Sequence, residues 1–200
     1  IVNSANELQL YDEAKESPSY LSTESNAING GSWEFLVKFS FNPSSSNYAD
    51  VFLCSDNQSL NEDLNGYYVK IGNTADEISL YRKDGSSSEM IIDGTDKRLD
   101  ASNINVRIKV NRDNLGNWEL YSDTLGGRNY YLEGTVFDDT YTESEYFGIN
   151  CIYTSTRWDS FFFDDFIVTD NSVLPEIIDY EVIDEQTIAI DFNKELDETS

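Results

Sequence analysis

Histidine is absent from this chain of 200 residues, and basic residues are scarce: 13 lysines and arginines stand against 38 aspartates and glutamates, for a formal net charge of −25. Without histidine, the chain lacks the commonest general base, the commonest zinc ligand and the usual partner of a serine or cysteine nucleophile. Without a basic face, it has nothing to neutralise phosphate groups. We therefore expect no nucleic-acid partner and no attraction to anionic membrane surfaces.

Cysteine and long apolar runs are also rare. Cys54 and Cys151 are the only cysteines, and they lie too far apart in sequence for a redox or metal-binding CxxC motif. Two alternatives follow, one disulfide or two buried thiols. No apolar run approaches the roughly 18 residues of a membrane-spanning helix, and no signal-peptide pattern opens the chain. Both ends break off abruptly, so we expect a fragment of a longer protein.

The chain does contain many segments in which apolar and polar residues alternate with period two, bounded by glycine, asparagine, aspartate and serine. In the run 33–41, one face carries Trp33, Phe35, Val37 and Phe39. No ten-residue window shows a helical stripe. Ten or more strands without helices predict an all-β sandwich, and the size favours a double-sheet jelly roll over an ordinary immunoglobulin domain.

A second unit is predicted after the polar stretch 170–172. Pro175 precedes a strand pattern that begins at Ile177, and residues 187–192 form another. About thirty residues are too few to close a sandwich of their own. We therefore predict a jelly-roll domain over residues 1–170 and the truncated start of a second β domain over residues 171–200.

Five segments of the chain together form a recognisable pattern. They are Ser32 to Phe35 (SWEF), Phe41 to Tyr48 (FNPSSSNY), Leu64 to Gly72 (LNGYYVKIG) and Tyr146 to Thr154 (YFGINCIYT), followed by Phe163 to Asp165 (FDD). In this order they resemble one known family, the concanavalin A-like or LamG-like jelly-roll module of large secreted Bacteroidetes proteins, in which it often accompanies lamin-tail and immunoglobulin-like domains.

The resemblance implies a jelly roll from Leu8 to Val168, with a further N-terminal strand before Ile1 that this chain lacks. Residues 174–197 are similar to the opening of a bacterial immunoglobulin-like surface domain. The family is known by its architecture more than by an activity. The resemblance therefore implies an extracellular or cell-surface location, reached by type IX secretion, with the secretion machinery and neighbouring domains of the same chain as partners.

Export into an oxidising compartment would permit a disulfide between Cys54 and Cys151 if their strands are neighbours. Cysteine is also a common small buried apolar residue, so two free thiols remain the alternative.

Catalysis is not expected from this sequence. Glycosidases built on jelly rolls place paired carboxylates on one strand, as in Glu-x-Asp-x-x-Glu, and no strand here has that spacing. The acidic clusters 138–145 and 62–63 fall in predicted loops, where solvated charge is the ordinary interpretation.

Asp164 and Asp165 interrupt an otherwise apolar strand, 161–168. Alternation places Asp164 with Phe162, Phe166 and Val168 on a core-like face, where a carboxylate needs hydrogen bonds or a cation. Related jelly-roll binding modules use an aspartate in this last strand for a structural calcium ion. Our hypothesis is therefore that Asp164 and Asp165 bind a calcium ion. The commoner alternative is that backbone N–H groups donate hydrogen bonds to these carboxylates.

A cluster of aromatic and polar residues precedes the last strand and consists of Tyr153, Arg157, Trp158 and Asp159. Sugars present flat apolar faces rimmed by hydroxyls, so an exposed ring beside polar side chains fits them. The alternative is that these rings are amphipathic residues at sheet edges. The cluster is our predicted ligand-binding site.

We therefore predict a non-enzymatic extracellular module that binds glycans, with a polysaccharide as the candidate partner, or that mediates adhesion. The alternative is a structural spacer without a ligand of its own. The first hypothesis requires an exposed aromatic groove on a sheet, whereas the second predicts a sheet face that is filled or covered.

Overall fold

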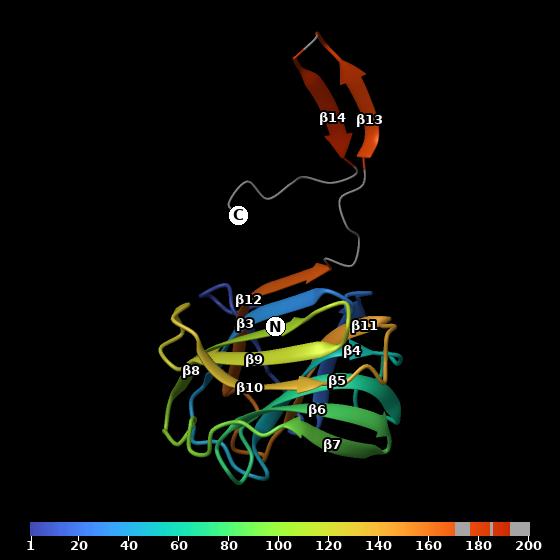
Figure 1. The fold of residues 1–200 in the computed structure, drawn as a ribbon. Helices are drawn as coiled ribbons and strands as arrows, with labels where there is room; N and C mark the ends of the chain where they lie inside the picture. Colours follow the sequence, from blue (N-terminus) through green and yellow to red (C-terminus); the bar gives the residue numbers. More distant parts are fainter. Residues whose placement is uncertain (171–176, 185, 193–200) are drawn as a thin grey trace.

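The computed structural model describes residues 1–170, 177–184 and 186–192, which form fourteen strands and no helix. None of the described segments forms a helix that could cross a membrane. The strands, labelled in Figure 1, are β1 (Leu8–Gln9), β2 (Ser19–Glu24), β3 (Gly31–Phe39), β4 (Tyr48–Ser55), β5 (Leu64–Ile71), β6 (Ile78–Gly85), β7 (Ser87–Ile92), β8 (Ile104–Arg112), β9 (Asn117–Asp123), β10 (Tyr131–Phe137), β11 (Tyr146–Ile152), β12 (Phe161–Asp170), β13 (Ile177–Val182) and β14 (Ile188–Phe192).

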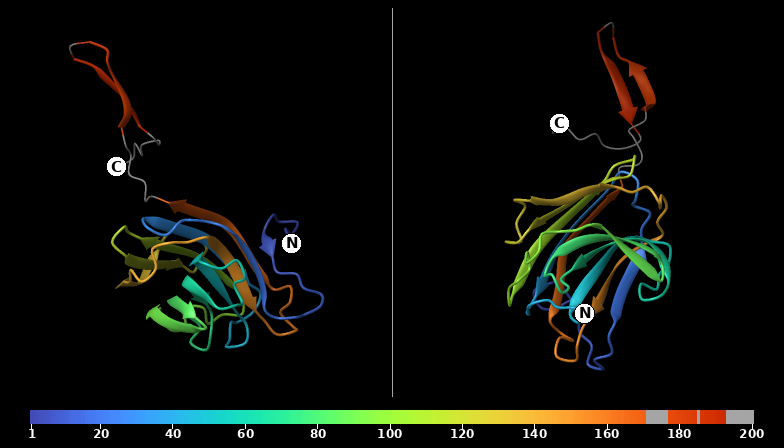
Figure 2. Two further views of the ribbon diagram at one scale, coloured as in Figure 1. Left: turned by 90° about the vertical axis from the view of Figure 1, so that its right-hand side faces the viewer. Right: turned by 60° about the horizontal axis from the view of Figure 1, so that its bottom comes forward.

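Twelve of these strands form two antiparallel sheets of six strands each, which pack face to face (Figure 2). Sheet A has the order β1-β12-β3-β8-β9-β10, and sheet B has the order β2-β11-β4-β5-β6-β7. Strands far apart in sequence are neighbours in both sheets, for example β12 with β3 and β11 with β4. The predicted all-β sandwich is therefore confirmed.

The inner faces of the two sheets form one large aromatic core. Trp33 and Phe35 from β3 are fully buried, as the alternation of the run 33–41 predicts. Trp33 stacks on Trp118 of β9 with ring centroids 5.8 Å apart, and Tyr67 of β5 reaches across from sheet B to Trp118 at 4.6 Å. Burial of these large rings supplies most of the hydrophobic stabilisation that holds the sheets together.

The predicted face of Asp164 is wrong, because β12 contains a bulge. Its pairing with β3 shifts between Asp164 and Ile167, and Asp165 has a φ of 52°. Phe161 before the bulge and Phe166 after it both point inward, since Phe166 contacts the ring of Phe35. Asp164 follows the buried Phe163 and therefore lies with Phe162 on the outer face of sheet A, and the extra residue after Asp164 returns Phe166 to the inner face.

Of the two alternatives for Cys54 and Cys151, the structure shows two free, buried thiols and contradicts the disulfide. They lie on neighbouring strands and face the same core. However, Cys151 pairs with Ala49, five positions from Cys54 and therefore about 15 Å away along the strand. A disulfide needs Cα atoms within about 7 Å. Burial raises the pKa of the Cys54 thiol to about 12, as expected for an inert apolar side chain.

Strands β13 and β14 pair with each other in a separate two-stranded sheet (Figure 1). They match the two strand patterns that the sequence predicts at 177–182 and 187–192. Pro175 and the predicted boundary at 170–172 fall largely outside the described residues. The assignment of residues 171–200 to an immunoglobulin-like domain stays a prediction.

Candidate functional site

A groove of about 520 Å³ lies on the outer face of sheet B. Its floor comes from strands β11, β4, β5 and β6. One wall is the loop between β4 and β5, which contributes Leu60 and Glu62, and Pro18 and Tyr48 line the opposite side. The groove exists because this loop folds over the sheet: a Cβ atom on Gly148 of β11 would lie only 2.7 Å from the side chain of Leu60.

A row of polar side chains crosses the floor of the groove. Strand register places Asn150 of β11 opposite Asp50 of β4, and Asp50 opposite Lys70 of β5. Directly opposite residues in an antiparallel pair lie within contact distance on the same face. Three residues from three separate parts of the chain therefore form one continuous polar surface.

A row of aromatic side chains runs beside the polar row. Phe52 of β4 pairs with Tyr68 of β5, and Tyr68 pairs with Tyr81 of β6. The ring centroids are 5.0 Å apart in the first pair and 5.2 Å apart in the second, where the two rings stack. With Leu60 and Leu64, these rings form a second apolar cluster that is separate from the core. The outer face of sheet B therefore has its own aromatic cluster, in which Phe52 and Tyr68 are buried against Leu60 and Tyr81 is half-buried.

Lys70 is held in place by charge and by aromatic rings. Its Nζ lies 3.0 Å from Asp50 Oδ1 and 3.9 Å from the centre of the Tyr48 ring. The rings of Tyr68 and Tyr81 lie 5.7 Å away. Burial raises the pKa of Asp50, and the attraction of Lys70 and of Lys83 offsets part of this rise. The Asp50–Lys70 pair is thus a partly desolvated ion pair within a ring of tyrosines.

Asn150 has an unused carboxamide group. Its side chain is 7% exposed, and its Oδ1 is buried without a hydrogen-bond partner. Within the described part of the chain, its Nδ2 has no partner either. A buried polar group without a partner costs about 1–3 kcal/mol. Such a group at the floor of a groove offers one donor and one acceptor to a bound molecule.

The structure does not bring the sequence-predicted cluster together as one exposed platform. Tyr153 is only 4% exposed and packs its ring against Phe161 in the core. Its hydroxyl is 2.6 Å from Ser19 Oγ and donates to Asp12 at 2.7 Å. Burial, together with the carboxylate of Asp12, raises the pKa of Tyr153 to about 12. The prediction that Tyr153 presents its ring to a ligand is therefore wrong.

The other members of that cluster are half-buried. Trp158 packs edge-on against Tyr11 at 4.9 Å, and the guanidinium of Arg157 lies 5.3 Å from the ring of Phe41. The backbone carbonyl of Asp159 accepts a hydrogen bond from Gln9. These contacts tie the N-terminal segment to the start of β12. These contacts explain the positions of Arg157, Trp158 and Asp159 without a ligand. Their ligand-binding role stays a prediction.

Asp164 and Asp165 do not fit a calcium ion. Asp165 Oδ2 accepts a hydrogen bond at 2.5 Å from Arg107, which lowers the pKa of Asp165. Asp164 Oδ1 accepts the backbone N–H of Asp165. A calcium site needs six to eight oxygen ligands. The described residues contain no group of three acidic or cysteine side chains that could hold a metal ion. The carboxylates are satisfied within the protein.

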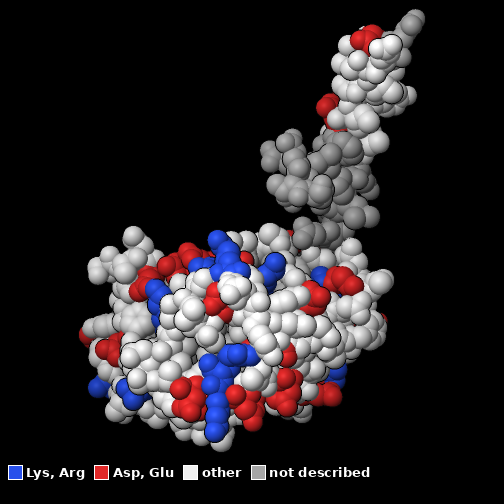
Figure 3. Space-filling model, turned by 60° about the vertical axis from the view of Figure 1, so that its left-hand side comes forward, with Lys and Arg blue, Asp and Glu red and all other residues white. Residues whose placement is uncertain are grey.

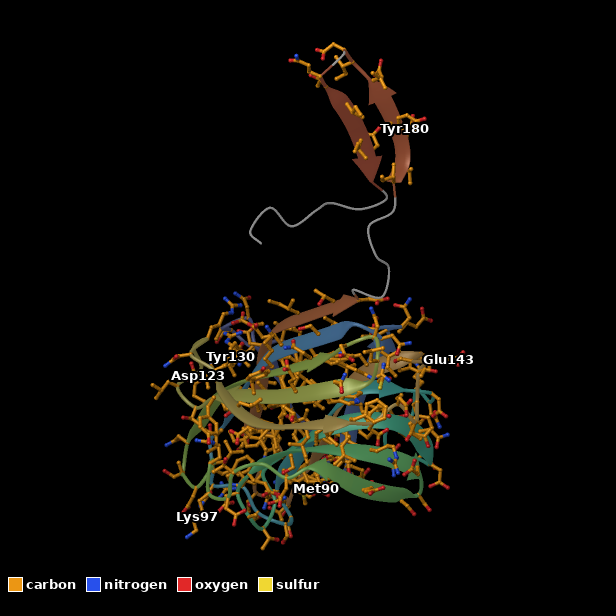
Figure 4. All side chains as sticks on the ribbon, in the orientation of Figure 1. Met90, Lys97, Asp123, Tyr130, Glu143 and Tyr180 are labelled. Atoms are coloured by element: carbon orange, nitrogen blue, oxygen red, sulfur yellow. The ribbon has the colours of Figure 1, made fainter. Side chains whose placement is uncertain are left out.

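Arg107 belongs to a charged network on the outer face of sheet A. It also bonds to Glu34 at 3.2 Å, and Arg128 reaches the same carboxylate at 2.7 Å. Burial and the nearby carboxylate of Glu34 raise the pKa of Tyr130, labelled in Figure 4, to about 12. On the face drawn in Figure 3, basic and acidic side chains are interspersed, with no purely basic patch. These charges are used to hold sheet A together.

The sequence analysis missed the groove. Its signal is nevertheless present: Phe52 and Tyr68 stand at outward positions between inward-facing apolar residues, so both faces of β4 and β5 are buried. An antiparallel strand with water on one face alternates cleanly between apolar and polar residues. The departure from alternation at Asp50 to Ser55 indicates that something covers this face.

The two packed antiparallel sheets define a jelly-roll sandwich, and the predicted fold class is confirmed. No protein-family model and no curated protein matches the chain. Similar solved structures include the exoplasmic/lumenal domain of VIP36 with Ca²⁺ and Man3GlcNAc bound, with a TM-score of 0.62 and 12% identity over 86% of this chain and 81% of that one.

Two further structures share the fold. The carbohydrate-binding module CBM66 from Bacillus subtilis has a TM-score of 0.51 and 13% identity, covering 82% of this chain and 92% of that one. The Emp46p carbohydrate recognition domain has a TM-score of 0.54 and 12% identity, covering 82% and 83%. At these identities, the likeness establishes the fold alone.

Proposed function

We propose that the groove on the outer face of sheet B binds a carbohydrate and that the protein is a glycan-binding module without catalytic activity. The observation that carries the proposal is the unused carboxamide of Asn150 at the floor of a tyrosine-lined groove. Sugar hydroxyls both donate and accept hydrogen bonds, so one hydroxyl pair would satisfy both ends of this carboxamide. The solved structures of similar fold that are titled as carbohydrate-binding proteins support the same proposal.

The aromatic row supplies the second element of such a site. The half-buried ring of Tyr81 stacks on Tyr68, which is only 4% exposed, so Tyr81 presents a firmly held apolar surface beside the polar row. A pyranose ring has one apolar face and a polar rim, which matches this arrangement. A few hydrogen bonds and one stacked ring correspond to affinities from micromolar to millimolar, about −8 to −4 kcal/mol. Repeated display on a larger protein would add avidity.

The extracellular location and the type IX secretion route rest on the resemblance of the sequence alone. They are part of the proposal because an accessible glycan-binding surface is useful where polysaccharides occur. A cell-fractionation experiment with an antibody against residues 1–170 tests the location independently of any ligand.

A glycan array tests the binding function. The protein is labelled and applied in three forms: wild type, Asn150→Ala, and Asn111→Ala as a matched control. Asn111 lies on the outer face of sheet A, where its side chain bonds to Ser32 and Glu119. We expect the wild type and Asn111→Ala to label the same glycans and Asn150→Ala to lose them. An array without any bound glycan contradicts the proposal and favours the spacer alternative.

A further inference from the structure

The groove contains two lysines, and only one of them has an acidic partner. Lys70 is paired with Asp50 at 3.0 Å. Lys83 of β6 lines the groove and forms no hydrogen bond or ion pair within the described residues. Both of its cross-strand neighbours are uncharged, Gly66 on β5 and Ser88 on β7. Its ammonium attracts Asp50 without forming an ion pair with it, and it can therefore meet a negative charge from outside the protein.

The free ammonium stands out because the chain as a whole is strongly acidic, with a net charge of −25. Among the charged residues that line the groove, Asp50 and Lys70 neutralise each other. Lys83 and Glu62 remain. Glu62 belongs to the β4–β5 loop and is exposed to solvent, whereas Lys83 is half-buried on the sheet. A charge is worth more where it is less hydrated, so Lys83 is the stronger of the two recognition elements.

The geometry points to a glycan that carries an isolated acidic group, with its neutral part on Asn150 and its acidic group on Lys83. This inference rests on the proposed function and specifies the chemistry of the ligand. Strand register connects Asn150 through Asp50 and Lys70 to Ser79 of β6. Lys83 therefore lies three strand spacings across the sheet (about 14 Å) and four residues farther along β6 (about 13 Å), or about 19 Å away in all. That distance exceeds one sugar ring, so the ligand is an oligosaccharide. One free cation and a strongly negative surface favour one acidic group over a polyanion.

The acidic group is a carboxylate or a sulfate ester, because both present oxygen atoms that accept charge-assisted hydrogen bonds from an ammonium. Such bonds are about twice as strong as neutral ones. We therefore expect the acidic form of a suitable glycan to bind about ten-fold more tightly than its neutral form, which is a difference of about 1.4 kcal/mol.

The test uses matched pairs of oligosaccharides that differ in one acidic group, measured by isothermal titration calorimetry. The pairs are xylotetraose with and without one glucuronic acid branch, lactose with and without sialic acid, and N-acetyllactosamine with and without a 6-O-sulfate. Binding of the first two acidic members identifies a carboxylate, and binding of the third identifies a sulfate. The protein is used as wild type, Lys83→Gln, Glu62→Gln and Lys109→Gln, a matched control on the outer face of sheet A.

We expect the wild type and Lys109→Gln to prefer the acidic member of at least one pair. Lys83→Gln should lower the affinity for that acidic member to the level of its neutral partner, and Glu62→Gln should increase the preference. Equal affinity for both members of every pair that binds, or a preference that survives Lys83→Gln, overturns the inference and leaves the glycan-binding function intact. If no member of any pair binds, the inference is overturned. The glycan array tests the glycan-binding function separately.

Discussion

Sheets A and B both carry charged residues on their outer faces, but they use them differently. On sheet A, Arg107 bonds to Glu34 and Asp165, so these three charges have partners within the protein. On sheet B, the carboxamide of Asn150 has no partner, and Lys83 has no acidic neighbour within hydrogen-bond distance among the described residues. A polar group that is satisfied stabilises the fold, whereas an unsatisfied one in a groove is available to a ligand.

Folding shifts the pKa values of two aspartates, one on each outer face, in opposite directions. A hydrogen bond from Arg107 lowers the pKa of Asp165 on sheet A. Burial raises the pKa of Asp50 on sheet B, despite its pairing with Lys70. The protein therefore favours the charged form of one carboxyl group and disfavours the charged form of the other. The comparison predicts that substitutions on sheet A mainly change stability and that substitutions on the floor of the groove mainly change binding.

The largest expected effect is on sheet A. Arg107→Ala should lower the free energy of unfolding by about 3 kcal/mol, because it leaves Glu34 and Asp165 without their shared, 7% exposed partner. Urea unfolding followed by tryptophan fluorescence measures this change. Arg128→Ala, which removes an exposed arginine from the same carboxylate, is the control and should change the stability little. If Arg107→Ala is as stable as the wild type, the charged network does not stabilise sheet A.

Trp158→Ala separates the sequence-predicted cluster from the groove. The ring is half-buried against Tyr11 and the edge of the core. Its removal should cost about 2 kcal/mol of unfolding free energy. Glycan binding should remain, because Trp158 does not line the groove. Loss of binding at unchanged stability would instead identify the cluster around Trp158 as the binding site.

Asn150→Ala should change binding and stability in different ways. Affinity for a glycan from the array should fall about ten-fold, which corresponds to about 1.4 kcal/mol. The free energy of unfolding should stay the same or rise, because the substitution removes a buried acceptor that has no partner. Calorimetric titration and urea unfolding of the same preparation measure both quantities. A clear loss of stability would show that the carboxamide is structural.

The smallest expected effect is a pH dependence at Asp165. Because the folded state lowers the pKa of this group below 3.8, its stabilisation is fully present above that value and disappears as the pH falls through the lowered pKa. The difference in urea midpoint between the wild type and Asp165→Asn should therefore be constant from about pH 7 to pH 5 and shrink below about pH 3.8. A difference that grows in acid would contradict the pairing with Arg107.

The sequence predicts the elements of the fold better than the details of the site. Period-two alternation identifies β3 and its buried face correctly, because that face depends only on local pattern. Which side chains of β12 face the core is not predictable in the same way, since one extra residue at Asp165 moves the following side chains to the other face. The calcium hypothesis depended on which face Asp164 occupies.

The groove was beyond local analysis for a different reason. Asn150, Asp50 and Lys70 become neighbours only through the pairing of β11 with β4 and of β4 with β5. Local sequence pattern carries no information on that register. Tyr153 and Trp158 are close together in sequence, but the structure places Tyr153 in the core. Residues that are adjacent in the chain are not adjacent on a sheet face.

Hydroxyl-radical footprinting of the tyrosine and tryptophan side chains, with and without the glycan that binds most tightly on the array, tests the central claim most directly. Tyr48 lines the groove, and Tyr81 stacks beside it on the lining residue Tyr68. Both are half-buried, as is Tyr121 on the outer face of sheet A. The account predicts that the glycan protects Tyr48 and Tyr81 and leaves Tyr121 and Trp158 unchanged. Protection of Tyr121 or Trp158, with Tyr48 and Tyr81 unaffected, would contradict it.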